Sequence, residues 1–362
     1  MHKRIDSLNF IRIIGMTMIL LFHAKLMYGF SVEQAWFDDM ISIGAIFVTV
    51  FFMLSGFGLR KSNRDLSFSD FSGVLKFYKK RILSIYPLFL LLTVVALIFQ
   101  FRAMDSWGET LMRLPIQFSM LHILVGKDMH GFLFNDNCWY ISALFVLYLL
   151  FPILNECVNR LRVRAKMVSC VVLWVVSIGV YFYCVYGTEL TFLDYYPNPF
   201  LRIPEFMIGM LCADLSEEIR NWLAGKRAIG KVCLANSNWV CTGIVGAMAI
   251  FAAIVLTILY PHFKQETNLY GVIVIPCTAV VFLCMANWEW GNRMGGNKLV
   301  RWLAGLGLEV YLCQSFATLV LAKVKVDGNV DEMVFMLLTI GFAVVVNTFF
   351  TRPIGKIGKA RG

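Results

Sequence analysis

Two ionisable side chains, Arg12 and His23, bracket the first long apolar stretch of the sequence, RIIGMTMILLFH. In a helix, eleven residues at about 100° each bring the two side chains to within roughly 20° of one face, about 16 Å apart along the axis. Ionisable groups inside a membrane helix usually face a bundle interior or a wet cavity. This pair could hold an anion at one end of a channel and perform acid–base chemistry at the other, because histidine titrates near neutral pH.

A structural explanation is open for each residue alone. Arg12 could extend to the membrane interface while its stem stays in the apolar region. His23 could make a single hydrogen bond to another helix. The shared face favours a functional pair over two unrelated structural roles.

Small and basic residues mark the next two apolar runs. Ser55, within FFMLSGFGL, has glycine neighbours that let another helix or a ligand come close, so it belongs to a packing seam or to a binding site. Lys79, Lys80 and Arg81 stand at the start of the third run. Clustered cations beside the free N–H groups of a helix start would suit phosphates, and lipid headgroups are the competing partner.

Aromatic and paired charged residues occur in later runs. Trp139 and Tyr140 follow Asn137 at the start of the fourth run, where they could form part of an interfacial aromatic belt or stack on a sugar. Arg202 and Glu205 are three residues apart, so a helix would allow them to form an ion pair that reduces the cost of insertion.

The composition identifies the chain that positions these residues as an integral membrane protein. Of its 362 residues 59% are hydrophobic and 15% charged, with a mean hydropathy of +0.71. Apolar runs long enough to cross the hydrocarbon as helices recur along it. They are 8–28, 42–60, 83–101, 138–155, 168–186, 200–215, 238–260, 269–286, 300–322 and 332–350. We expect an all-α, polytopic transmembrane helical bundle of about ten spans in one domain, 1–362.

The distribution of Lys and Arg indicates whether the short run 200–215 crosses the membrane. With ten spans and the N-terminus inside, 24 Lys/Arg lie on the cytoplasmic side and 8 outside. If 200–215 did not cross, the count would become 16 against 16. The positive-inside rule therefore predicts ten spans with both the N-terminus and the C-terminus cytoplasmic.

Several other functions are disfavoured. The net charge of +10 lies in loops facing anionic lipids, so we expect membrane lipids rather than nucleic acid as its partner. The cysteines and histidines match no standard spacing of metal ligands, so no metal is predicted. The sequence shows no internal repeat of the kind on which many transporters are built.

The chain resembles bacterial integral-membrane acyltransferase family three, which includes O-acetyltransferases of cell-surface glycans. The resemblance rests on the arginine and histidine separated by ten residues, FFMLSGF, RILSIYP, WYISALFVLYLLFP, RIPEFMIG and LGLEVYLCQ, in that order. It implies a membrane O-acyltransferase of the bacterial cytoplasmic (inner) membrane. Such an enzyme moves an acyl group, acetyl first among candidates, from cytosolic acyl-CoA to a hydroxyl of a cell-envelope glycan or glycolipid, with no permanently bound cofactor.

The resemblance also implies roles for residues. His23 would be catalytic with Arg12 as its partner, and the donor acetyl-CoA would be held by Arg12, Ser55, Lys79, Lys80 and Arg81. Candidates for contacts with the acceptor substrate are Asn137, Trp139, Tyr140, Arg202, Glu205, Tyr311 and Gln314. Family members commonly carry arginine at Ser84, glutamate near Leu144 and histidine at Gln314. The alternative function is that of a transporter or flippase for a glycolipid or small anion, with His23 as a proton relay.

Overall fold

A computed structural model describes residues 4–100, 107–124, 137–188, 196–228, 241–245, 247–248, 251, 267–324 and 330–354. This part of the chain is helical and contains no strand. The helices are α1 (Leu8–Tyr28), α2 (Ala35–Ser42), η1 (Gly44–Ile46), α3 (Phe47–Ser62), α4 (Phe71–Gln100), α5 (Trp107–Phe118), η3 (His122–Leu124), α6 (Cys138–Asn159), α7 (Val163–Tyr186), η5 (Pro199–Arg202), α9 (Ile203–Ala228), α11 (Thr267–Asn287), α12 (Glu289–Gly295), α13 (Lys298–Gly305), α14 (Gly307–Val324), α15 (Asp331–Val346) and η6 (Asn347–Thr351). The predicted all-α class is confirmed for the described residues.

Six described helical segments are long and apolar enough to cross a membrane, or eight if two bent pairs each count as one span. The bent pairs are α11 with α12, at 83°, and α13 with α14, at 46°. All eight coincide with predicted runs. Of the other two runs, 200–215 coincides with the start of the more charged α9, and 238–260 lies largely outside the described residues. The count of ten and the cytoplasmic termini therefore stay predictions.

Helix α4 differs from its predicted run in one respect that matters for the site. It begins at Phe71, twelve residues before the predicted start at 83. Lys79, Lys80 and Arg81 therefore lie inside the helix, where backbone N–H groups bond to the preceding turn. The expectation that free N–H groups at a helix start would help these cations bind phosphate is wrong.

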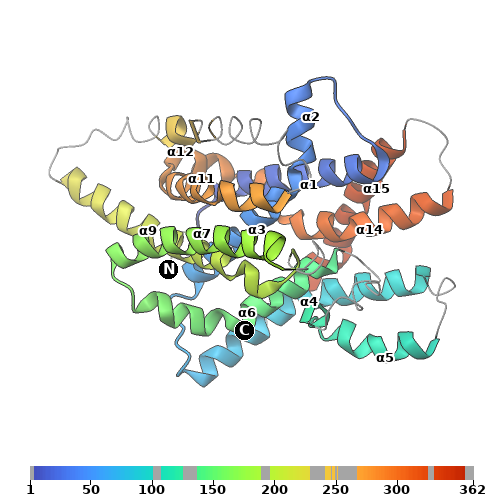
Figure 1. Ribbon diagram of the computed structural model, residues 1–362, viewed down its shortest axis with the longest axis horizontal. Coiled ribbons are helices and arrows are strands. Elements are labelled where there is room, and N and C mark those ends of the chain that lie inside the picture. Colours follow the sequence, from blue (N-terminus) through green and yellow to red (C-terminus); the bar gives the residue numbers. More distant parts are fainter. Residues whose placement is uncertain are drawn as a thin grey trace.

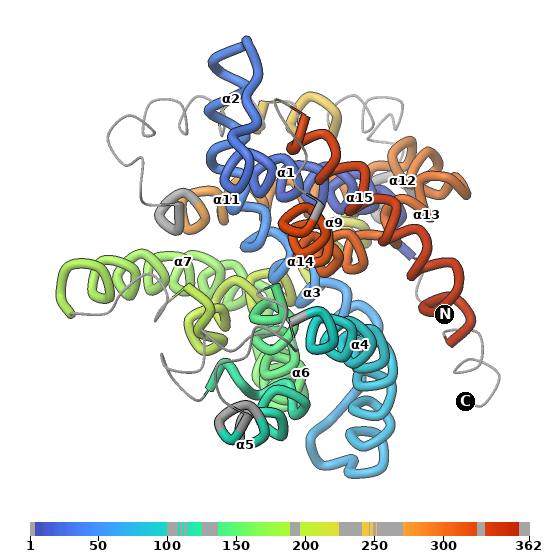
Figure 2. The backbone as a smooth tube through the Cα atoms, turned by 90° about the vertical axis from the view of Figure 1, so that its right-hand side faces the viewer, coloured from blue at the N-terminus to red at the C-terminus, as the bar shows by residue number. Residues whose placement is uncertain are grey.

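Helix α9 lies at the centre of the bundle. It packs against α3 most extensively, and also against α7, α11 and α6, while α14 packs on α15 and α1 (Figure 1). Every residue from 208 to 216 is buried, so this part of the helix is covered on all sides. Helices α4, α5 and α6 gather on one side of the bundle, and α2 projects from it (Figure 2). Because neighbouring helices surround α9, its polar residues can be paired within the protein.

Two glycines allow α3 and α9 to cross closely. A Cβ atom added at Gly56 would lie 2.0 Å from the carbonyl oxygen of Phe206, and one added at Gly209 would lie 1.9 Å from that of Met53. Both neighbours are backbone atoms, which cannot rotate away. The crossing is reciprocal, each helix presenting a glycine to the backbone of the other, as small residues do at helix contacts in membranes.

We expect Gly56→Ala or Gly209→Ala to push α3 and α9 apart and to lower stability by about 1–3 kcal/mol, the usual cost of overpacking. Thermal unfolding of the purified protein in detergent measures the effect. Gly58→Ala on the same helix is the control, because a Cβ there meets nothing within 4 Å. Equal melting temperatures for all three variants would show that the helices do not depend on this close approach.

Candidate functional site

A cavity of about 450 Å³ lies among α1, α3, α4, α6, α13 and α14. Most of its lining is apolar, with side chains such as Ile19, Phe51 and Leu308. The cavity brings together six of the residues predicted from the sequence: Arg12, Ser55, Arg81, Tyr140, Tyr311 and Gln314. An apolar cavity with a few convergent polar groups is the usual form of a small-molecule site.

Arg12 reaches the cavity from the first half of α1. Its Nη1 donates a hydrogen bond to Oδ1 of Asn9 at 2.7 Å, and Nδ2 of Asn9 donates to the carbonyl oxygen of Gly295 at 3.0 Å. Asn9 is fully buried, so it holds the guanidinium in place against α12. Asn9 was not among the predicted site residues, although its place one turn before Arg12 was a usable signal.

Arg81 is the member of the predicted basic cluster that enters the cavity. Its guanidinium lies 5.5 Å from the ring centroid of Phe77, and its Nε is buried without a hydrogen-bond partner. Lys79 and Lys80 are exposed and are not part of the lining. Arg12 and Arg81 both lie in the early half of helices predicted to start at the cytoplasmic side, so this part of the cavity is positively charged.

His23 and Gln314 lie toward the other end of α1. The side chain of Gln314 lines the cavity and lies beside the imidazole of His23. Nδ1 of His23 and both Oε1 and Nε2 of Gln314 are buried and make no hydrogen bond of normal geometry, although the two side chains lie beside each other. A buried polar group without a partner costs about 1–3 kcal/mol, so these side chains are candidates for contact with a molecule bound in the cavity.

One wall of the cavity is formed by α6. Tyr140, Leu144 and Tyr148 line it at intervals of four residues, which places them on one helix face. The ring of Tyr140 packs 5.5 Å from that of Tyr311, and the hydroxyl of Ser55 lies beside the phenols of Tyr140 and Tyr148. Tyr148 was not predicted, although its spacing from Tyr140 was visible in the sequence.

Seven predicted residues are not part of this lining: His23, which lies beside Gln314, the exposed Lys79 and Lys80, and Asn137, Trp139, Arg202 and Glu205. Asn137 donates from Nδ2 to the carbonyl oxygen of Tyr311 at 2.8 Å, joining α6 to α14, and Trp139 packs 4.9 Å from Tyr196. Arg202 and Glu205 form the predicted ion pair, at 2.8 Å, and line a second cavity. The pairing of Arg202 with Glu205 is confirmed, and the structure separates the pair from the lining of the first cavity.

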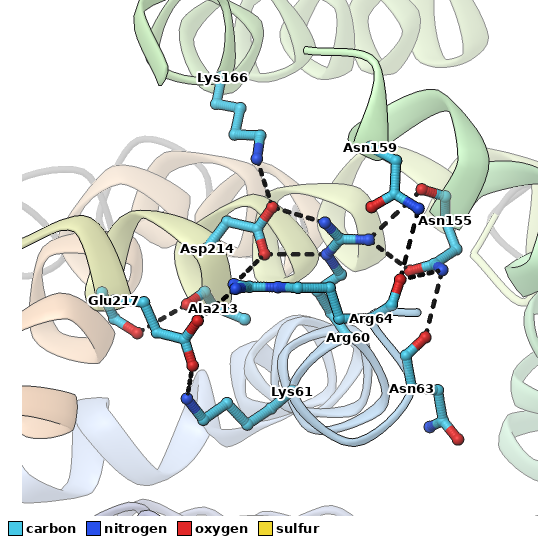
Figure 3. A network of polar contacts seen from close by, with 11 residues as sticks. Arg60, Lys61, Asn63, Arg64, Asn155, Asn159, Lys166, Ala213, Asp214 and Glu217 are labelled. Atoms are coloured by element: carbon cyan, nitrogen blue, oxygen red, sulfur yellow. Dashed lines mark hydrogen bonds and ion pairs between the residues drawn. The ribbon is translucent and has the colours of Figure 1, made fainter. Parts of the chain in front are cut away.

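A buried charge network, absent from the sequence analysis, lies at the end of α3 beyond the cavity residues Gly58 and Leu59 (Figure 3). Asp214 on α9 accepts from Nε and Nη2 of Arg60 at 2.9 and 2.7 Å. It also pairs with Arg64 at 2.6 Å and with Lys166 on α7 at 2.5 Å. Arg60 is 2% exposed, so this is a buried ion pair.

The network extends to further elements. Asn155 on α6 accepts from Nη1 of Arg60 at 2.7 Å and donates to the carbonyl oxygen of Leu66 at 2.7 Å, while Glu217 pairs with Lys61 and Arg64. Burial by itself would lower the pKa of Arg64, but the carboxylates of Asp214 and Glu217 more than offset this and raise its pKa. The network joins α3, α6, α7 and α9 at one end of the bundle.

Comparison with known proteins gives one family and one relative. A family model described as an acyltransferase domain matches residues 5–352. The chain is also 32% identical over 133 residues to "Acyltransferase MdmB" of Streptomyces mycarofaciens. That match covers 34% of this chain and 31% of the relative, so it spans under a third of the relative's length. No solved structure matches the chain.

We expect Asp214→Leu to destabilise the protein by about 3–5 kcal/mol, because it leaves the buried guanidinium of Arg60 without a carboxylate. Arg60→Met combined with Asp214→Leu should recover much of that loss, since the double variant buries neither charge. Denaturation of the wild type, of Arg60→Met, of Asp214→Leu and of the double variant in one detergent measures the coupling between the two residues.

Arg160→Gln is the control for this pair. The side chain of Arg160 is 77% exposed where it pairs with Glu156, so its loss should change stability by at most about 1 kcal/mol. A double variant that is as unstable as the sum of the two single variants would argue against direct coupling of Arg60 and Asp214.

Proposed function

The chain belongs to acyltransferase family three, and on that premise we propose that it is a membrane O-acyltransferase. It transfers an acyl group, acetyl first among candidates, from cytosolic acyl-CoA to a hydroxyl of a cell-envelope glycan or glycolipid. The observation that carries this proposal is the arrangement of the larger cavity. Arg12 and Arg81 line it together with Gln314, and Gln314 lies beside the buried imidazole of His23.

The proposed setting is the bacterial cytoplasmic membrane, crossed ten times, with both termini in the cytoplasm. In this orientation Arg12 and Arg81 lie toward the cytosol, where acyl-CoA is found. His23, eleven residues after Arg12 on α1, lies deeper in the membrane. The family match and the six to eight apolar helical segments support a protein that crosses the membrane several times.

The donor would be held by charge at its head and by apolar contact along its arm. Phosphates of CoA bind Arg12 and Arg81 through charge-assisted hydrogen bonds, and Nε of Arg81 lacks a partner within the protein. The pantetheine arm then runs along the apolar lining toward Gln314. The exposed Lys79 and Lys80 attract the donor without contacting it in the cavity.

Transfer needs a base for the acceptor hydroxyl. In a direct route, His23 removes the hydroxyl proton while the oxygen forms a bond to the thioester carbonyl carbon, and Nε2 of Gln314 donates to the developing oxyanion. The C–S bond then breaks, and the thiolate of CoA takes the proton from the imidazolium. In a two-step route the imidazole itself carries the acyl group before the acceptor removes it.

The acceptor would enter from the outer side. Trp139 and Tyr140 lie at the start of α6, at the end predicted to be extracytoplasmic, and Tyr140 also lines the cavity. Aromatic rings at this position present flat apolar surfaces to a sugar. Tyr140 therefore links the proposed entry of the acceptor to the cavity that would hold the donor.

We expect His23→Ala to lower acceptor-dependent CoA release by about 10²–10⁴-fold, the usual contribution of a general base. The assay uses purified protein, radiolabelled acetyl-CoA and a mixed pool of bacterial cell-envelope glycans. Ile14→Ala, at a 53% exposed position on the same helix, should retain wild-type turnover. Wild-type turnover in His23→Ala would contradict the proposal.

The same assay without acceptor separates the two routes. A two-step route releases up to one equivalent of CoA per enzyme, whereas a direct route releases none. If the folded protein turns over neither acetyl-CoA nor longer acyl-CoA donors, substrate flux in vesicles without CoA becomes the decisive measurement. Flux under that condition would favour the transporter.

We expect Arg81→Gln to raise the KM for acetyl-CoA by about 10- to 100-fold, because it removes a charged hydrogen-bond donor worth about 1.5–3 kcal/mol. Lys76→Gln changes the same net charge at an exposed position of α4 and should alter the KM little. Equal effects of the two variants would mean that general attraction, rather than contact with Arg81, binds the donor.

A further inference from the structure

A second cavity, of about 230 Å³, lies between α7, the η5–α9 segment and α11. Its lining is largely apolar, and it includes Val180 on α7 and Val272 on α11. Two of its apolar side chains, Val176 and Phe200, are 46% and 53% exposed, so the cavity reaches the outer surface of the bundle. No residue is shared between the described linings of the two cavities.

Glu205 is a lining residue of this cavity, and one of its carboxylate oxygens is unsatisfied. Its Oε1 accepts from Nη1 of Arg202 at 2.8 Å and from the hydroxyl of Thr49 at 3.1 Å. Its Oε2 is buried and has no hydrogen-bond partner, and the residue is only 2% exposed. A buried carboxyl oxygen without a partner leaves room for one hydrogen bond, and a small shift of the side chain would let a ligand in the cavity make it.

The charge of the site restricts the donor. Arg202 uses Nε and Nη2 to bind the carbonyl oxygen of Tyr196, at 3.1 and 2.8 Å, and its remaining terminal nitrogen to bind Glu205. The Arg202–Glu205 pair is neutral overall. A cationic ligand would add an uncompensated charge to an apolar cavity, whereas a neutral hydroxyl satisfies Oε2 without doing so.

We propose that this second cavity binds the hydroxyl-bearing end of a neutral amphiphile drawn from the surrounding membrane. The hydroxyl donates to Oε2 of Glu205, and the alkyl part passes between the exposed side chains of Val176 and Phe200. Thr49 and Phe52 separate this site from the donor cavity: Thr49 bonds to Glu205, and Phe52 packs between Arg202, at 5.7 Å, and Tyr140, at 4.9 Å. The inference concerns binding alone and does not depend on acyl transfer.

The test is photolabelling in nanodiscs of phosphatidylcholine, which has no headgroup hydroxyl, in the absence of acyl-CoA. The probe is a monoacylglycerol with a diazirine in its acyl chain, and the control probe is its di-O-methyl ether. Peptide mapping should show that the hydroxyl probe labels α7 and α9 about tenfold more than the ether, as a hydrogen bond to a charged group implies. Equal labelling by the two probes would overturn the proposal.

Variants identify the site. Val180→Phe fills the cavity and should abolish the preference for the hydroxyl probe, while Val175→Phe, at a 55% exposed position outside the lining, should retain it. Glu205→Gln turns an amide N–H toward the cavity, so the preference should fall to about one. A preference that survives Val180→Phe would overturn the assignment. If Val180→Phe fails to fold, Val176→Phe replaces it, because Val176 lies at the exposed edge of the cavity and a larger side chain there should block entry.

Because no acyl-CoA is present, these results are separate from those of the transfer assay. An enzyme that transfers acyl groups but labels equally with both probes retains the proposed function and loses this site. An enzyme with the labelling preference but no transfer keeps the site and loses the proposed function.

Discussion

The cost of an unpaired charge in an apolar surrounding is the constraint on which this structure depends. Helix α9 lies in the middle of the bundle and carries both Glu205 and Asp214, which would exclude it from that place if either lacked a partner. Asp214 is paired with three cations drawn from α3, the segment after it and α7. The charged residues that lower the hydropathy of α9 therefore also bind it to the neighbouring helices.

The buried polar atoms near the larger cavity differ from those of this network. The buried network around Asp214 shows that distant helices of this protein can bring partners to a carboxylate when the role is structural. At His23, Gln314 and Arg81 the protein leaves buried nitrogen and oxygen atoms without partners, and all three residues lie in or beside one cavity. The network around Asp214 holds helices together, whereas the polar atoms of His23, Gln314 and Arg81 lie in or beside the cavity that we propose as the ligand site.

What the sequence could predict was local. The pairing of Arg202 with Glu205 follows from three residues of one helix, and the shared face of Arg12 and His23 follows from the helical repeat alone. The ion pair between Arg60 and Asp214 joins positions 154 residues apart, and no spacing rule connects them. The basic cluster is an intermediate case, because its three cations could be identified from the sequence but their directions could not. The start of α4 at Phe71 and the packing of Arg81 on Phe77 show that Arg81 points toward the cavity, whereas Lys79 and Lys80 are exposed.

The placement of Arg12 and His23 on one continuous helix has a further consequence for how a donor is recognised. Because α1 is rigid, the distance between the cation and the imidazole, about 16 Å along the axis, is fixed by the backbone rather than by loops. A ligand that satisfies only Arg12 and Arg81 leaves the polar atoms of His23 and Gln314 unpaired. A ligand with an anionic head and a long, mostly apolar arm that ends in a polar group satisfies both ends together. The acyl-CoA donor that we propose has an anionic head and an arm long enough to reach both ends, whereas an inorganic anion could contact only one of them.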